Sequence, residues 1–175
     1  MSRIKPFLMS LVVAGATVGG LSCQVSPAMA DADGDSTVAN VQVGLSITLS
    51  DLTDSFILQG NPGETVSTGT GLPVTMRVTT NNFAGYTVTV QPAAAALVGA
   101  IAGNTDTVSS SLLQVLGPAQ TNFTALDSAA PLEVARKGTR SDPDGDIITN
   151  SYRITIPFVR PDTYSGTLNY VATTL

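Results

Sequence analysis

Apolar and polar residues alternate along several short runs of this chain, and this period of two constrains its fold more than any other feature. The alternating runs are residues 41–49, 74–79, 86–90, 152–158 and 167–172. Because successive side chains of a β-strand point to opposite faces, each run indicates a strand with one buried face. Helical periodicity is poor beyond residue 30. Only residues 92–100, with four consecutive alanines, are compatible with a short helix or, equally, with an irregular crossover.

The segment 81–85 separates two of the clearest runs, 74–79 and 86–90. It contains Asn81, Asn82 and Gly85, and both residue types tolerate the positive φ of tight connections. Two alternating runs joined by such residues predict a β-hairpin with a longer loop.

Threonine is frequent in the chain, and no strand–helix–strand alternation is visible. This pattern predicts an all-β fold, an immunoglobulin-like antiparallel β-sandwich of about seven to nine strands that forms a single domain over residues 41–175. Residues 60–72, which contain four glycines, Asn61 and Pro62, are expected to form a loop inside it. Pro157 cannot donate to a ladder and is expected at an edge position or bulge. The weaker strand candidates are residues 55–59, 111–116, 122–126 and 131–135.

Residues 1–30 have the features of a secretory signal peptide. Arg3 and Lys5 are followed by an apolar stretch, and Ala28 and Ala30 occupy the −3 and −1 positions of a cleavage site. The alternatives are a transmembrane anchor, for which the apolar stretch is short, and a lipoprotein modified at Cys23. We expect a bacterial protein that is secreted to the extracellular space or the cell surface. Its mature chain would have a flexible acidic leader, residues 31–40, and no membrane span.

The chain has no His and one Cys, which excludes Ser/His/Asp and Cys/His relays, imidazole metal ligands and thiolate clusters. We therefore expect no enzymatic activity and no cofactor, apart from the calcium site considered next. Thirteen Asp and Glu outnumber eight Lys and Arg, and the one basic cluster, residues 136–140, is flanked by acidic residues. Binding to nucleic acid is not expected.

Asp142, Asp144 and Asp146 place carboxylates at alternate positions of a short loop. Ca²⁺ prefers oxygen ligands, so this loop is a candidate metal site. The spacing does not follow the EF-hand pattern, because Ile147 and Arg153 stand where that pattern has Gly and Glu. The alternative interpretation is a solvated turn in which Asp and Gly serve the turn geometry.

Asn81, Asn82 and Phe83 form a candidate ligand loop, in which the Phe83 ring is expected to face solvent and to offer a platform for a glycan. The other aromatic residues, Phe158 among them, fall mostly on the apolar phase of predicted strands and are expected in the core.

Residues 38–49 have the apolar alternation that a strand lent to another subunit would need. The alternative is that they form the first strand of their own domain. Self-association is accordingly one of the interactions considered for this chain.

The stretches VTMRVTTNNFAGYTVTV at 74–90 and YRITIPFVRPDTYSGTLNYVATT at 152–174 resemble strands of bacterial secreted or cell-surface β-sandwiches. The similarity is to actinobacterial exported proteins and, distantly, to fimbrial or WxL-type surface domains, although the chain has no Trp. The resemblance implies an extracellular module and no catalytic residues. We expect a secreted structural or adhesive protein whose partner is a cell-surface or extracellular protein, a glycan or a second copy. The alternative is a secreted ligand-binding module for calcium or glycan.

Overall fold

A computed structural model describes residues 33–69 and 71–175. It comprises two units, one ending at Val41 and one spanning Gln42–Leu175. The predicted signal peptide, with Ala28, Ala30 and Cys23, lies outside the described residues. The described part of the leader, residues 33–40, is exposed and contains no strand.

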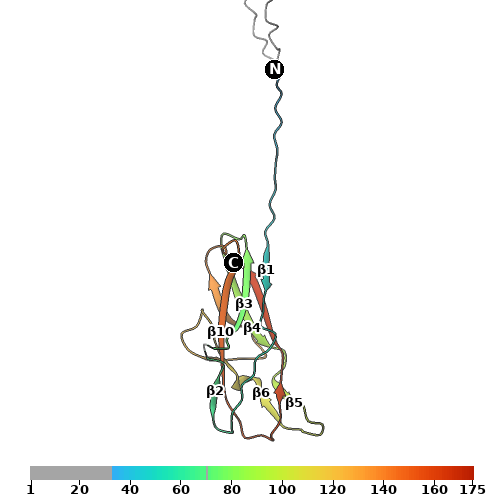
Figure 1. Cartoon of the computed structure of the whole chain (residues 1–175), viewed down its shortest axis with the longest axis vertical. Coiled ribbons are helices and arrows are strands. Elements are labelled where there is room, and N and C mark those ends of the chain that lie inside the picture. Colours follow the sequence, from blue (N-terminus) through green and yellow to red (C-terminus); the bar gives the residue numbers. More distant parts are fainter. Residues whose placement is uncertain (1–32, 70) are drawn as a thin grey trace, which may run out of the picture. The chain divides into compact units, whose positions relative to one another are not determined.

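Twelve strands and one 3₁₀ helix, η1 (Ser110–Leu112), make up the regular structure of the described residues (Figure 1). The largest sheet has the order β1 (Ile47–Ser50), β3 (Val74–Thr80), β10 (Asp146–Thr155), β7 (Gln114–Leu116), β8 (Thr124–Ala125), and β2 (Thr65–Ser67) also pairs with β10. The second sheet has the order β12 (Leu168–Thr174), β4 (Tyr86–Pro92), β9 (Leu132–Lys137). A small third sheet has the order β11 (Tyr164–Ser165), β5 (Ala96–Gly99), β6 (Thr107–Ser109). All described pairings are antiparallel.

The two larger sheets share one apolar core. Strands β3 and β4 both alternate strictly between buried and half-buried residues, and their buried side chains join those of β7, β9 and β10. Tyr152 is fully buried, and its ring stacks on Phe56 with 4.6 Å between centroids. The chain is therefore the predicted all-β antiparallel sandwich. It has more strands than expected because short strands form within the stretch 60–72, at residues 96–99 and near residues 107 and 164.

The connection between β3 and β4 corrects the predicted hairpin. Both strands form close to the predicted bounds, but β3 pairs with β1 and β10, whereas β4 pairs with β9 and β12. The segment 81–85 therefore crosses from one sheet to the other. Each strand is central in its sheet and has no free edge to offer the other, a constraint that alternation alone does not reveal.

The first strand is shorter than predicted. Of the alternating run 41–49, only Ile47–Leu49 are in β1, which ends at Ser50. Ile47 stands opposite Thr80, the last residue of β3. Residues 41–46 have no strand partner among the described residues, because the strand that would pair with them has already ended.

The end of β10 corrects a second expectation. The strand stops at Thr155, two residues before Pro157, and Phe158 is 96% exposed rather than buried. Pro157 cannot donate a ladder hydrogen bond, and the backbone N–H of Val159 turns back to the carbonyl of Pro157 at 3.1 Å. The alternation of the run 152–158 thus extends beyond the strand that it indicates.

Candidate functional site

The loop 81–85 holds the chain that enters β1. The backbone N–H of Ser46 donates to Asn81 Oδ1 at 2.8 Å, and Asn81 Nδ2 donates to the carbonyl of Gly44 at 2.7 Å. The amide of Asn81 thus takes the place of a strand partner just before β1 begins, and its hydrogen-bonding groups are already used within the protein.

The same loop holds the end of β12. Asn82 Nδ2 donates to the carbonyls of Gly85 (2.8 Å) and Leu175 (3.0 Å), and the backbone N–H of Leu175 donates to Gly85 O at 3.0 Å. Gly85 has φ +93°, and a Cβ there would lie 1.9 Å from the carbonyl oxygen of Lys137, so only glycine fits. The loop therefore secures both the first and the last strand of the unit 42–175.

Phe83, at the tip of the loop, is 76% exposed. The Arg140 guanidinium lies over its ring, 5.0 Å from the centroid, which is cation–π geometry. The glycan site at Asn81, Asn82 and Phe83 stays a prediction.

Asp146 differs from the two carboxylates with which it was grouped. Its side chain accepts from Lys137 Nζ at 2.8 and 2.9 Å, from the Tyr86 hydroxyl at 2.8 Å and from the backbone N–H of Asp142 at 3.2 Å. Burial alone would raise the pKa of Asp146, but the hydrogen bonds from Lys137 and Tyr86 lower it below its ordinary value. Burial and the bond to Asp146 raise the pKa of Tyr86. Asp146 therefore joins the loop to β9 and β4.

Asp142 and Asp144 are exposed, and the backbone carbonyl of Asp144 accepts from Arg77 Nη1 at 2.6 Å. In residues 33–69 and 71–175, no group of three or more His, Cys, Asp or Glu side chains is placed to hold a metal ion. The calcium site at Asp142, Asp144 and Asp146 stays a prediction.

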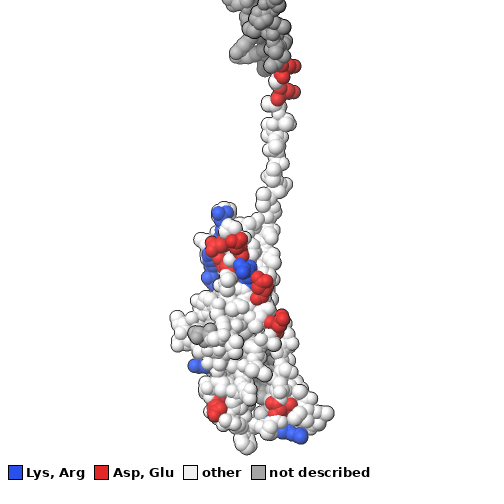
Figure 2. All heavy atoms as spheres, viewed as in Figure 1, with Lys and Arg blue, Asp and Glu red and all other residues white. Residues whose placement is uncertain are grey.

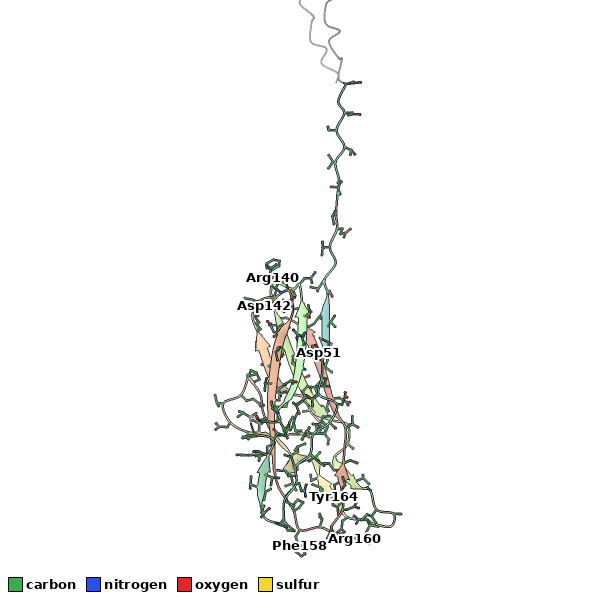
Figure 3. The ribbon with its side chains drawn as sticks, viewed as in Figure 1. Asp51, Arg140, Asp142, Phe158, Arg160 and Tyr164 are labelled. Carbon is green, nitrogen blue, oxygen red and sulfur yellow. The ribbon has the colours of Figure 1, made fainter. Side chains whose placement is uncertain are left out.

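Residues of the loops 81–85 and 142–146 line one hollow on the surface of the sandwich. It is lined by Asn81, Arg140 and Asp142, together with Thr79, Thr80, Ser141 and Pro143. Arg140 and Asp142 lie at one end of the sandwich, and charged side chains gather there (Figures 2 and 3). Sequence reasoning did not predict this juxtaposition, because the two loops are far apart in the chain.

At the other end of the sandwich lie Phe158, Arg160 and Tyr164 (Figure 3). The Asp162 carboxylate accepts from Asn104 Nδ2 (2.7 Å) and from the backbone N–H groups of Ile101 and Thr163. The hydrogen bond from Asn104, ahead of those from the backbone, lowers the pKa of Asp162. This polar cluster holds the loop that follows β5. Phe158, at the same end of the sandwich, projects into solvent.

The outer edge of β12 is open. The backbone N–H of Leu175 donates to Gly85 O, and the backbone N–H of Ala93 donates to Thr167 O. Because alternate residues of a strand direct their N–H and C=O groups to the same side, the odd-numbered residues of β12 direct these groups to β4. Within the described residues no strand pairs with the opposite side of β12. The N–H and C=O groups directed to that side belong to Leu168, Tyr170, Ala172 and Thr174.

The side chains of these four residues lie on the core face of β12, but all are only half-buried. On the neighbouring strand β4, the core-facing Tyr86, Val88 and Val90 are at most 3% exposed. The Tyr170 hydroxyl contacts that of the buried Tyr152 and accepts from Asn150 Nδ2 at 3.4 Å, which anchors the strand from inside. The core is therefore covered less completely at β12 than in the middle of its sheet.

The chain before β1 carries an exposed apolar stripe. Val41, Val43 and Leu45 are 87%, 77% and 67% exposed, and Val38 is 83% exposed. No residue from Ser36 to Ser50 is charged, and this segment is white in Figure 2. In the described residues no helix is long and apolar enough to cross a membrane.

Comparison with known proteins gives distant structural likenesses only. No family model matches the chain, and no curated protein matches its sequence. A chain from a chaperone-usher pilus, in a structure reported to reveal the basis of rod uncoiling, is 12% identical over 86% of this chain and all of that chain, with a TM-score of 0.37. At this identity and TM-score the likeness establishes no function. Nothing in these comparisons supports the resemblance to actinobacterial exported proteins or to WxL-type domains.

Proposed function

We propose that the protein is a non-enzymatic structural or adhesive protein of the bacterial cell surface or extracellular space, and that it binds another protein through residues 38–45. The observation that carries this proposal is the apolar phase that continues outward from β1. Val41, Val43 and Leu45 occupy the same alternate positions as Ile47 and Leu49. Ile47 and Leu49 pack against the core, but the three preceding side chains are exposed.

Exposed apolar side chains of this size favour burial. Each contributes about 1.5–3 kcal/mol when it is fully removed from water. An extended segment without a ladder partner also presents free N–H and C=O groups to a neighbouring strand. Residues 38–45 combine both properties, except that the carbonyl of Gly44 already accepts from Asn81, and they have no charged side chain to oppose pairing.

The external location rests on the first thirty residues. Basic residues, an apolar stretch and the small residues Ala28 and Ala30 follow the order of a bacterial signal peptide. The sandwich beyond them has a buried apolar core and contains no cysteine, so it needs no disulfide in an oxidising compartment.

Cell fractionation and immunogold microscopy test the proposal. We expect the full chain, produced in a bacterium with a secretion system, to be exported and retained at the surface. The double variant Val41→Asp/Val43→Asp should be exported but released into the medium. The control Asn40→Asp/Gln42→Asp adds the same charge to the opposite phase and should be retained. Cytoplasmic protein, or equal retention of both variants, would contradict the proposal.

The ligand-binding alternative predicts a different result. Calcium or a soluble glycan that binds only the native state raises the melting temperature of the protein. A rise with Ca²⁺ that is lost in Asp142→Asn/Asp144→Asn would favour a calcium-binding module, and no rise with either ligand would leave the structural proposal in place.

A further inference from the structure

We infer that the partner of residues 38–45 is a second copy of this chain, and that the segment adds as a strand to the free edge of β12, beside β1. This inference rests on the proposed function, because it takes residues 38–45 as the binding element. It assigns an acceptor surface, which the proposed function leaves open.

The acceptor has unpaired backbone groups and an incompletely covered core. The outward N–H and C=O groups of Leu168, Tyr170, Ala172 and Thr174 face no strand among the described residues. Strand β1 is the edge of the other sheet, and Cα atoms of β1 and β12 come within 8 Å without any pairing between the two strands. A strand added here would bond to β12 and would cover half-buried side chains of both sheets.

The donor matches this edge in length, charge and phase. Residues 38–45 are eight residues long and β12 is seven. Neither the donor nor β12 contains a charged residue, so pairing brings no charge into the interface. With Val41, Val43 and Leu45 directed to the core, the alternate positions Asn40, Gln42 and Gly44 face solvent, as a strand at the rim of a sandwich requires. Val38, at the far end of the segment, is the one large apolar side chain on the solvent side.

A second copy is favoured over the chain's own edge by the geometry just before β1. Asn81 bonds to both Gly44 and Ser46, so residues 44–46 run straight into β1. To reach its own β12, the chain would have to reverse at these residues and give up both bonds. Donor and acceptor are different surfaces of the same chain, so each copy can offer one of each. Copies joined in this way make a heterologous contact, which generates open chains, or rings where the rotation between copies closes.

Mixing two defective variants tests the inference. Val41→Asp/Val43→Asp disables the donor and leaves the acceptor intact. Ala172→Pro removes one outward N–H of the acceptor and leaves the donor intact, and Thr174→Pro does the same if Ala172→Pro does not fold. Circular dichroism and thermal melting check folding, and light scattering after size exclusion gives the mass.

We expect wild type and the control Asn40→Asp/Gln42→Asp to have at least about twice the mass of the monomer. Each defective variant alone should be monomeric, and their mixture should form one-to-one dimers and nothing larger. A wild-type protein that stays monomeric would overturn the inference. This holds also where hydrogen exchange shows that residues 38–45 of the monomer are protected, because the segment would then pair within its own chain. The proposed function would survive that result if surface retention still depends on Val41 and Val43, and would fail separately if it does not.

Discussion

At the scale of single residues, Asp146 makes the densest set of polar contacts around the loop 142–146. Its carboxylate accepts from Lys137, Tyr86 and the backbone of Asp142, and its side chain is 14% exposed. Asp146→Asn removes the charge that these donors stabilise, so we expect a loss of about 1–3 kcal/mol in the free energy of unfolding at pH 7. Urea denaturation of both proteins measures it, and equal midpoints would contradict the assignment.

The same substitution has a predictable pH dependence. The folded-state pKa of Asp146 is lowered, so its contribution is complete above the unfolded-state pKa of about 3.9 and is lost as the pH falls through the folded value. The difference between wild type and Asp146→Asn should therefore be constant from about pH 7 to 5 and shrink below about pH 4. A difference that grows on acidification would show the opposite sign of shift.

At the scale of elements, the two faces of β12 provide a test of the open edge. Thr173 directs its N–H to β4, whereas Ala172 directs its N–H outward. Thr173→Pro breaks a ladder bond and should destabilise the fold by about 1–3 kcal/mol more than Ala172→Pro, which removes a donor that has no strand partner in the described unit. Equal losses in urea denaturation would show that β12 is paired on both sides.

Strand faces could be predicted from this sequence, but strand partners could not. The period of two located β3, β4 and β12, and of β10 only the last residues, 152–155, because burial of one face leaves its mark on every second residue. The alternation carries no information on which strands pair with each other. The runs 74–79 and 86–90 were therefore predicted to form a hairpin, although they lie in different sheets.

The candidate site shows the same limit. Asn81, Asn82 and Phe83 were found as loop residues, but the bonds of the two asparagines to Gly44 and Leu175 depend on strand order. Phe158 was placed in the core because the alternation runs past the end of its strand.

At the scale of the whole molecule, the titratable groups predict stability that varies little near neutrality. The chain has no His, the side chain that ordinarily titrates between pH 5 and 8. The resolved shifts lower the pKa of Glu64, Asp146 and Asp162 and raise that of Tyr86, Tyr152 and Tyr170. Lowered carboxyl values stabilise the fold above about pH 4, and raised tyrosine values stabilise it below about pH 10.

The free energy of unfolding should therefore change by less than about 0.5 kcal/mol between about pH 5.5 and 7.5. It should decrease below about pH 4 and above about pH 10. Urea titrations at intervals across this range measure it. A change of about 1 kcal/mol or more between pH 5.5 and 7.5 would require a titrating group that the structure does not identify.

The loop 81–85 also determines where the two ends of the unit 42–175 lie. It secures the start of β1 through Asn81 and the last residue, Leu175, through Asn82, so both ends of the unit 42–175 emerge at the same pole. Phe158 and Arg160 lie at the opposite pole (Figure 3). Whether the unit is tethered from its first strand or through a fusion at Leu175, the end that carries Phe158 and Arg160 lies away from the point of attachment.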